Sequence, residues 1–505
     1  MTVHSDDLPF ITKFFTYLPY SVAIAFSYCR QFAFAVYYAL TGKIFFDDVE
    51  HVRPGYAPLV HGFGMFFERW LYRRINDLFA RPVKGIPGGY MDVMLRSGAE
   101  NSLFQQLECT GELKKCLNLG SYNYLGFAEN SGPCLEAVKS AINDWGTTCS
   151  SSRMEMGSTK VHRELEQLVS KFVGKEDAIV FGMGYATNST TLPALCKRGD
   201  LIVSDMLNHA SIIVGCRSSG ATVKCFKHND PSHLEKVVFK AIIDGQPRTH
   251  RPWNKILIVV EGIYSMEGEI LKLPEIIRIK KKYGCYLYVD EAHSIGALGP
   301  TGRGVTEYWG ANPDDIDILM GTFTKSFAAC GGYLAGSQAL VDYLRMTAFS
   351  SVSDVAMPVP ICQQIISSLS IIAGYDGTDD GKRRLKQLSD NTHYFRQKLE
   401  EFGFLIIGDY DSPVVPLMVM QPSKMPAFSR LCLDHHVAVV MASYPATELE
   451  LSRARFCMTS SHTRPDIERA LEVIKRVGKD CLLVYSKDDP LYKTVYARSP
   501  QRPKN

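Results

Sequence analysis

The stretch that decides the fold is IDILMGTFTKSF, residues 316–327. Its first five residues are mostly apolar, as in a buried strand, and a turn of Gly, Thr and Ser then surrounds Lys325. In a parallel sheet covered by helices, the carboxyl ends of the strands face the ligand. A lysine placed there among small and hydroxyl residues can lose its proton and attack an aldehyde, so Lys325 is predicted to be a nucleophile. The alternative, a solvated lysine in a loop, fits poorly with the apolar strand before it.

Short apolar runs recur along the chain, separated by stretches long enough for a helix. They lie at residues 178–181, 201–203, 256–260, 286–289 and 316–320. Before the first of them, residues 161–172 repeat apolar side chains at helical spacing, and Gly174 follows as a helix stop. Strands alternating with helices predict an α/β fold with a mostly parallel central sheet flanked by helices.

From about residue 385 the pattern predicts a smaller C-terminal α+β domain, with helices around 391–402 and 465–477 and strands near 413–420 and 438–441. The predicted organisation therefore has five parts: an N-terminal membrane-associated segment (1–47), a connector or small-domain segment (48–118), a catalytic domain (119–384), the small domain (385–486) and a disordered tail (487–505). The tail prediction rests on its charged residues and prolines.

Residues 14–40 are almost wholly apolar and aromatic, with one charge at Arg30. The uncharged part, residues 14–29, is shorter than the roughly 20 residues that a helix needs to cross a bilayer. An N-terminal helix lying in the membrane interface is therefore favoured over a tilted spanning helix with a snorkelling Arg30. A buried core helix and a cleaved signal peptide fit less well.

The composition excludes several classes of function. The net charge is +3, and lysine and arginine are spread along the chain, so no basic patch for nucleic acid is predicted. The 14 cysteines show no zinc-ligand spacing, so no metal site is predicted, and reduced thiols in a cytosolic environment fit best.

The motif YLYVDEAH places Asp290 at the end of an apolar run and His293 three residues later. An aspartate there can pair with a protonated pyridine nitrogen, and a histidine can reach the phenolic oxygen of the same ring. Thr322 and Thr324 can bind a phosphate. An aspartate at a strand end is more often a helix cap, but jointly with Lys325 these residues predict pyridoxal phosphate (PLP), bound to the lysine as a Schiff base.

Three further features support this prediction more weakly. GMGYATN, residues 182–188, follows a strand and opens a helix whose first N–H groups can hold a phosphate. It also partly matches a dinucleotide fingerprint, so a nucleotide-dependent oxidoreductase is an alternative, but Thr187 replaces the third glycine. His209 follows another strand end and could stack on a cofactor ring, or be a structural histidine. Arg455 could clamp a carboxylate.

Together the motifs resemble the α-oxoamine synthases, the PLP-dependent transferases of fold type I that condense an amino acid with an acyl-CoA. The resemblance is carried by GSYNYLGF (120–127), SRMEMG (152–157), VEGIYSMEG (260–268), DEAHSIGALGPTGRG (290–304) and the lysine segment. Within the family, the chain is most similar to the catalytic long-chain-base subunits of eukaryotic serine palmitoyltransferases.

The resemblance implies a role for each matching residue. Lys325 would be the Schiff-base lysine, Asp290 the pyridine partner, His293 and Ser265 neighbours of the ring oxygen, His209 the stacking histidine, Thr322, Gly184 and Tyr185 the phosphate cup, Asn123 and Arg455 groups near the substrate carboxylate, and Thr447 a contact near the acyl chain. Two departures concern loop closure rather than chemistry. Glu448 stands where the family usually has proline, and Ala-Ala-Cys at 328–330 replaces a Gly/Ser run.

The activity implied is the decarboxylating condensation of L-serine with palmitoyl-CoA to 3-ketodihydrosphingosine, the first step of sphingolipid biosynthesis. Other α-oxoamine synthases use glycine or alanine with a different acyl-CoA, and a noncatalytic partner subunit lacks the lysine. The partners implied are that noncatalytic long-chain-base subunit 1 as a heterodimer, a small activating subunit and orosomucoid-like regulators. The implied location is the endoplasmic reticulum membrane, with the catalytic domain facing the cytosol.

Overall fold

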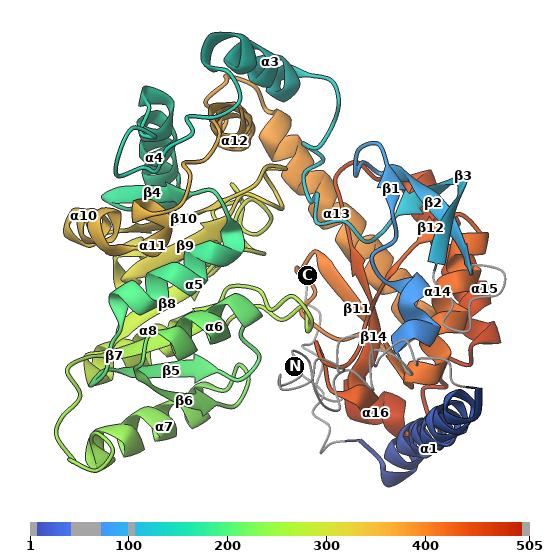
Figure 1. Cartoon of the computed structure of the whole chain (residues 1–505). Coiled ribbons are helices and arrows are strands. Elements are labelled where there is room, and N and C mark those ends of the chain that lie inside the picture. Colours follow the sequence, from blue (N-terminus) through green and yellow to red (C-terminus); the bar gives the residue numbers. More distant parts are fainter. Residues whose placement is uncertain (1–7, 42–71, 99–106, 497–505) are drawn as a thin grey trace.

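The computed structural model describes residues 8–41, 72–98 and 107–496. Figure 1 shows a larger α/β body beside a smaller α+β body, which is built from both ends of the chain. The part of the connector at 48–71 lies outside the described residues.

The larger body contains a seven-stranded sheet in the order β4–β10–β9–β8–β7–β5–β6. The strands are β4 (Asp177–Phe181), β5 (Leu201–Asp205), β6 (Thr222–Phe226), β7 (Ile256–Glu261), β8 (Tyr286–Asp290), β9 (Ile318–Thr322) and β10 (Gly332–Gly336). Strands β9, β8, β7, β5 and β6 run parallel, whereas β10 pairs antiparallel with both β4 and β9. The predicted mostly parallel sheet is therefore confirmed. Most of its strands are buried along their whole length, as expected for a sheet covered on both faces.

Helices cover both faces of this sheet (Figure 1). They are α3 (Pro133–Trp145), α4 (Lys160–Val173), α5 (Gly184–Leu195), α6 (Ala210–Ser218), α7 (Pro231–Asp244), α8 (Leu273–Tyr283), α9 (Val305–Tyr308), α10 (Gln338–Thr347), α11 (Phe349–Val352) and α12 (Val359–Ile372), with the short 3₁₀ turn η4 (Pro313–Asp315). The predicted helix at 161–172 is α4. It begins at Thr159, whose side chain accepts from the His162 N–H, and ends at Gly174, whose φ of 73° suits glycine.

The smaller body combines two sheets. One has the order β11–β14–β13 and the other β1–β2–β3–β12. Its elements are β1 (Val83–Lys84), β2 (Tyr90–Gly98), β3 (Leu107–Asn118), β11 (Val414–Met420), β12 (Val437–Ala438), β13 (Val440–Ala442), β14 (Ser452–Cys457), helices α13 (Asp380–Glu401), α14 (Met425–Asp434), α15 (Arg464–Asp480) and α16 (Pro490–Tyr496), and turns η3 (Tyr72–Leu78), η5 (Pro422–Lys424) and η6 (Leu449–Leu451). Strand β12 pairs parallel with β3, which joins the predicted connector to the C-terminal domain.

The structure differs from the sequence-based expectations in three places. The strand expected at 316–320 begins at Ile318, because Asp317 turns its carboxylate to the Leu287 N–H at 2.7 Å. Strands β1, β2 and β3 of the connector segment and strands β6, β10 and β14 were not predicted. Strand β6 alternates exposed and buried residues, and β10 starts with glycine. The expectation of disorder from 487 onward is wrong for α16, whose Leu491 and Val495 are buried in an apolar cluster. Residues 497–505 lie outside the described part.

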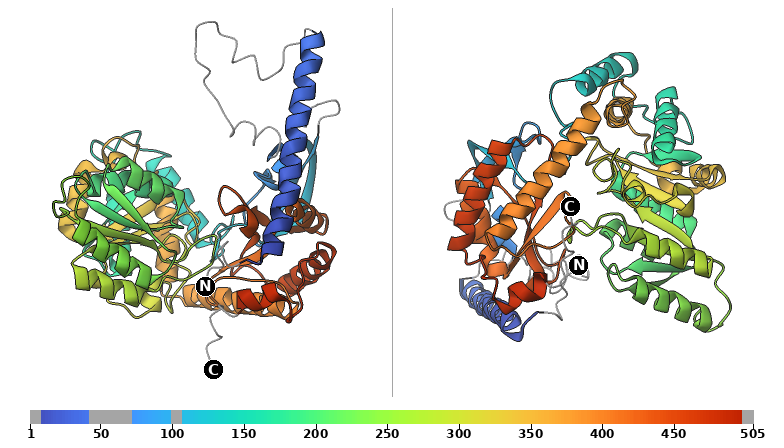
Figure 2. Two further views of the ribbon diagram at one scale, coloured as in Figure 1. Left: turned by 90° about the horizontal axis from the view of Figure 1, so that it is seen from below. Right: turned by 180° about the vertical axis from the view of Figure 1, so that it is seen from behind.

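Helix α1 (Phe10–Thr41) runs along the smaller body, away from the seven-stranded sheet (Figure 2). Leu8, just before it, is buried with Leu451 of η6 and with residues of α16. Most large apolar side chains of α1 are exposed, among them Phe10 at 82% and Phe32 at 72%. Within the described ranges, no helix combines the length and hydropathy required to cross a membrane.

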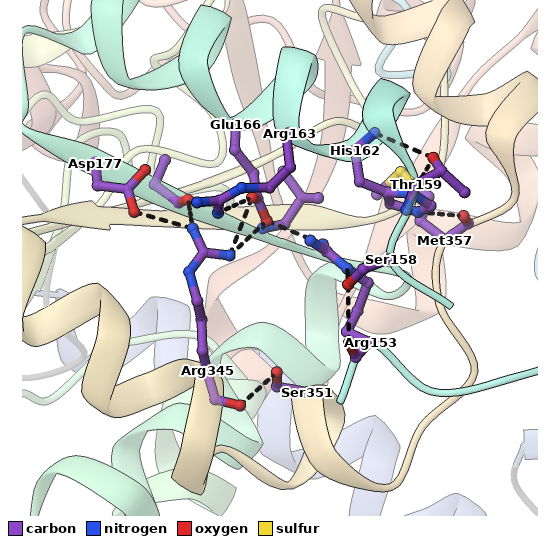
Figure 3. Close-up of polar contacts among 12 residues, drawn as sticks. Arg153, Ser158, Thr159, His162, Arg163, Glu166, Asp177, Arg345, Ser351 and Met357 are labelled. Carbon is purple, nitrogen blue, oxygen red and sulfur yellow. Dashed lines mark hydrogen bonds and ion pairs between the residues drawn. The ribbon is translucent and has the colours of Figure 1, made fainter. Parts of the chain in front are cut away.

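A buried ion cluster joins α4, β4 and α10 to the loop before α4 (Figure 3). The Glu166 carboxylate is fully buried and accepts from Arg153 at 2.9 Å, from Arg163 at 2.8 Å and from Arg345 at 3.0 Å. Arg345 also reaches Asp177 at 2.9 Å. Arg153 belongs to the SRMEMG motif, so this cluster fixes that motif to the sheet.

Replacing Glu166 by glutamine is expected to lower the free energy of unfolding by about 3 kcal/mol, because buried arginines lose their charged partner. The measurement is the urea concentration at the midpoint of unfolding of the full chain. The slope of the free energy of unfolding against urea concentration should be the same in all variants. The matched control is Glu164→Gln, which changes an exposed carboxylate on the same helix. Equal midpoints for the two variants would contradict this account of the cluster.

Candidate active site

The carboxyl ends of three adjacent strands bring acidic and hydroxyl groups together. Strands β7, β8 and β9 are parallel neighbours, and they end at Glu261, Asp290 and Thr322. Glu261 stands directly opposite Asp290 in the ladder. This edge of the sheet also leads into the turn that carries Lys325, so the motifs that the sequence singled out meet at one place.

Asp290 is buried and its carboxylate is fixed at both oxygens. Oδ2 accepts from the Asn188 side chain at 2.8 Å, and Oδ1 accepts from the Ala292 N–H at 2.9 Å. Asn188 is itself oriented by the Tyr288 hydroxyl, which donates to its oxygen at 2.7 Å. The carboxylate is thus pre-positioned at the strand end, as a partner for a ring nitrogen requires.

Lys325 is half-buried in the turn after β9. Desolvation lowers the pKa of its ammonium group to about 8, although the carboxylates of Asp290 and Glu261 oppose the shift. Its Nζ lies 5.6 Å from the centre of the Tyr122 ring. A lysine with this pKa has an appreciable neutral fraction near neutral pH, as a nucleophilic amine needs.

His293 is buried next to Lys325 and contacts two tyrosines. Its Nδ1 shares a hydrogen bond of 2.8 Å with the Tyr124 hydroxyl, and its ring meets the Tyr122 ring edge-on at 5.3 Å. Burial lowers the pKa of His293 well below its usual value, and the positive charges of Lys325 and Arg455 act in the same direction. The imidazole is therefore neutral at physiological pH.

His209 begins α6 and remains exposed. Its N–H donates to the Glu261 carboxylate, and its Nδ1 shares a hydrogen bond of 2.8 Å with the Ser211 hydroxyl. The ring meets Tyr185 edge-on at 5.9 Å. Its backbone and one ring nitrogen are thus fixed, so the imidazole has a defined orientation at the edge of the site.

The start of α5 lies against the end of β9. A Cβ added to Gly184 would lie 2.5 Å from the Thr322 hydroxyl oxygen, so only glycine fits there. Thr322 shares a 2.9 Å hydrogen bond with the Thr324 hydroxyl, and residue Met183, which precedes the helix, provides no side-chain cap. Helix N–H groups and two hydroxyls therefore converge, and this donor set fits the phosphate of PLP.

Arg455 of β14 approaches the same place from the smaller body. It is 6% exposed, and its guanidinium carbon lies 4.6 Å from the centre of the Tyr122 ring. Its second contact is the Met266 sulfur at 3.9 Å. Among the residues that the structure describes, its buried Nε has no hydrogen-bond partner. A buried cation with an unused donor suits a substrate carboxylate.

The remaining predicted residues lie around this centre. Asn123 is buried, and its amide donates to the Pro87 carbonyl at 3.1 Å and accepts from the Ala128 N–H at 3.3 Å. Ser265 is half-buried in the loop after β7. Thr447 is half-buried beside η6, where its hydroxyl donates to the Glu448 carbonyl at 3.3 Å. Direct roles for these three with substrate or cofactor stay predictions.

Sequence reasoning assigned no role to three residues of the site: Tyr122, Asn188 and Glu261. Tyr122 lies among Lys325, His293 and Arg455. Burial, together with the nearby Asp290 carboxylate, raises the pKa of Glu261 well above its usual value. Both Tyr122 and Glu261 occur in motifs quoted for the family resemblance, but only the register of β7 and β8 reveals that Glu261 faces Asp290.

Comparison with known proteins places this geometry in a family. Residues 114–474 match the model of aminotransferase class I and II. The chain is 51% identical to serine palmitoyltransferase 2 of Dictyostelium discoideum over 95% of this chain and 96% of that protein. It is 48% identical to long chain base biosynthesis protein 2a of Arabidopsis thaliana, over 93% and 94% of the two chains.

Among solved structures, a serine palmitoyltransferase from S. paucimobilis with PLP and myriocin bound superposes with a TM-score of 0.72. That match has 27% sequence identity and covers 83% of this chain and 98% of the other. The expected PLP-dependent transferase fold of type I is thus confirmed. The chain belongs to the aminotransferase class I and II family and, within it, to the group of serine palmitoyltransferase 2 and long chain base biosynthesis protein 2.

Proposed function

We propose that the chain is the catalytic subunit of a serine C-palmitoyltransferase, which condenses L-serine with palmitoyl-CoA and releases CoA and CO2. The observation that carries the proposal is the meeting of Lys325, of lowered pKa, with the fixed carboxylate of Asp290 and the unpaired donor of Arg455. The relatives named as serine palmitoyltransferase 2 support the choice of substrates.

The cofactor that the donor set fits is PLP, which when bound supplies an electron sink for the electrons of the serine Cα–H bond. Asp290 would accept the hydrogen bond of the pyridine N–H, and Thr322 with the first turn of α5 would hold the phosphate. His293, neutral and fixed by Tyr124, would lie at the ring oxygen, with Ser265 as a second neighbour. His209 would lie against the ring face.

Two basic side chains, Lys325 and Arg455, would act on the substrate. The neutral amine of Lys325 would remove the Cα proton of serine and return a proton after CO2 leaves. Arg455 would bind the serine carboxylate through its free Nε, with Asn123 near the same group. Thr447 would contact the acyl chain.

The product carries a long alkyl chain, which partitions into a bilayer with about 0.8 kcal/mol per buried CH2 group. The exposed aromatic and aliphatic surface of α1 suits attachment to the membrane interface. We place the chain on the cytosolic face of the endoplasmic reticulum membrane, as a heterodimer with the noncatalytic long-chain-base subunit 1. The further partners in this proposal are a small activating subunit and orosomucoid-like regulators.

The test is turnover by the chain co-expressed with that subunit, comparing L-serine with glycine and alanine across acyl-CoA lengths. Release of CoA and CO2 in equal amounts, highest with serine and palmitoyl-CoA, is the expected result. A preference for glycine, for alanine or for a short acyl-CoA would assign the chain to another α-oxoamine synthase activity.

The pH dependence of cofactor attachment follows from Lys325. The neutral amine is the reactive form, so the rate of PLP uptake by the apo-enzyme should rise with pH and level off above a midpoint near the pKa of about 8. The measurement is stopped-flow absorbance of the bound cofactor across this range. A midpoint near 10.5, the ordinary value for lysine, would show that the site does not desolvate the amine.

A further inference from the structure

The membrane-proximal helix is bonded to the segment that carries Thr447. The Tyr17 hydroxyl of α1 donates to the Glu450 carboxylate of η6 at 2.6 Å. Glu450 is 4% exposed and Tyr17 is 44% exposed, so the bond is partly buried, with its carboxylate end inside the protein. The hydrogen bond to Glu450 is the main reason that the pKa of Tyr17 rises to about 12, so the phenol stays a donor at physiological pH.

The Glu450 end of the bond belongs to a closed turn. The Leu451 N–H donates to the Glu448 carbonyl at 3.0 Å, and the Ser452 hydroxyl donates to the Leu449 carbonyl at 2.7 Å. The hydroxyls of Ser443 and Ser452 share a hydrogen bond of 2.7 Å across the base of the turn. Residues 444–451, which include Thr447, are therefore held between this base and α1.

The same turn leads directly to the substrate site. The buried Arg453 donates from Nε to the Leu451 carbonyl at 2.9 Å and from a terminal nitrogen to the Met266 carbonyl at 2.6 Å. The sulfur of Met266 contacts Arg455 at 3.9 Å. These contacts place the segment 444–451 beside the proposed carboxylate site, as a site that brings the two substrates together requires.

We propose that Tyr17 is a positioning residue for the acyl substrate: its hydrogen bond to Glu450 sets the segment 444–451 in the conformation that accepts the acyl chain. This inference rests on the proposed function. Its physical basis is that α1, which the proposed function places at the membrane interface, is bonded to Glu450, three residues from Thr447. Docking of α1 on the smaller body and ordering of the segment 444–451 would then occur together.

The position of the bond also predicts which substrate is affected. Serine would be held by Arg455, which is fixed independently by the Tyr122 ring and by strand β14. Segment 444–451 has fewer fixed points, because Pro445, Ala446 and Glu448 are exposed. Loss of the Tyr17 bond should therefore loosen acyl-CoA binding and leave serine binding intact.

The test variant is Tyr17→Phe, which removes one oxygen atom and keeps the ring. The matched control is Tyr28→Phe, which removes the same atom from an exposed ring about three turns further along α1. Both are made in the full chain, co-expressed with the noncatalytic subunit and loaded with PLP. Three quantities are measured: the KM for palmitoyl-CoA, the KM for serine, and backbone hydrogen exchange of residues 444–451.

For Tyr17→Phe, the KM for palmitoyl-CoA is expected to rise about three- to tenfold, as for loss of one typical hydrogen bond at a partly buried position. The KM for serine should stay unchanged, and exchange in 444–451 should become faster. Tyr28→Phe should change neither the KM for palmitoyl-CoA nor this exchange. Unchanged exchange, or an equal rise of both KM values, would overturn the proposal. If the wild-type complex does not turn over serine with palmitoyl-CoA, the proposed function fails, while the exchange result still decides whether Tyr17 orders the segment.

Discussion

Replacing Lys325 by alanine is expected to lower turnover at least about a thousandfold, because one amine serves both as the attachment point of PLP and as the base at the serine Cα. The variant should still bind PLP without a covalent link, since Asp290, Thr322 and the start of α5 remain. The measurements are CoA release under saturating substrates and the loss of borohydride-fixed cofactor on the chain.

A second variant separates the nucleophile from its charge. Lys325→Arg keeps a cation in the turn but cannot form the link, so it should be as inactive as the alanine variant. Thermal unfolding of the PLP-free proteins should match the wild type, because Lys325 forms no ion pair with any residue in the described part of the chain. More than about a tenth of wild-type turnover in either variant would rule out the assigned role.

Changing Asp290 to asparagine is expected to reduce turnover by about a hundred- to a thousandfold, because a neutral amide cannot stabilise a protonated pyridine nitrogen. The side chain should keep its place, since asparagine has nearly the same shape and its one oxygen can still accept from the Ala292 N–H, although the bond from Asn188 is lost. Turnover and the absorbance maximum of bound PLP are the measurements.

The control for this variant is Asp314→Asn, an exposed acid in the 3₁₀ turn at the opposite end of β9, which should behave as wild type. Equal activity of Asp290→Asn and wild type would mean that another group faces the ring nitrogen. Glu261 is then the next candidate, because it stands opposite Asp290 at the same sheet edge.

Much of the catalytic body could be predicted from the sequence because its signals are local. Apolar runs mark β4, β5, β7 and β8, and the acid and lysine motifs follow directly after strands. Other strands escaped prediction for physical reasons. Strand β6 is half-exposed, and β14, which carries Arg455, is a buried strand containing two arginines that resembles a polar loop.

The roles of Lys325 and Asp290 could be predicted, because they follow from the chemistry of the residues themselves and from their place after a strand. A role was not predictable where it comes from a neighbour distant in sequence. Tyr122 becomes a site residue only because Arg455 and His293 fold against it, and Glu450 gains significance only from Tyr17, 433 positions away. A single sequence carries no signal for such pairings.

The pairing of β3 with β12 has a consequence for biosynthesis. The β2–β3 hairpin leaves the ribosome about 320 residues before the strand that completes its sheet, and strand edges exposed for that long invite pairing with other chains. The nascent chain must therefore keep this hairpin sheltered until translation is nearly finished. Premature termination before Val437 would release a polypeptide whose catalytic half is nearly whole but whose β3 edge stays open, a ready substrate for chaperones and for degradation.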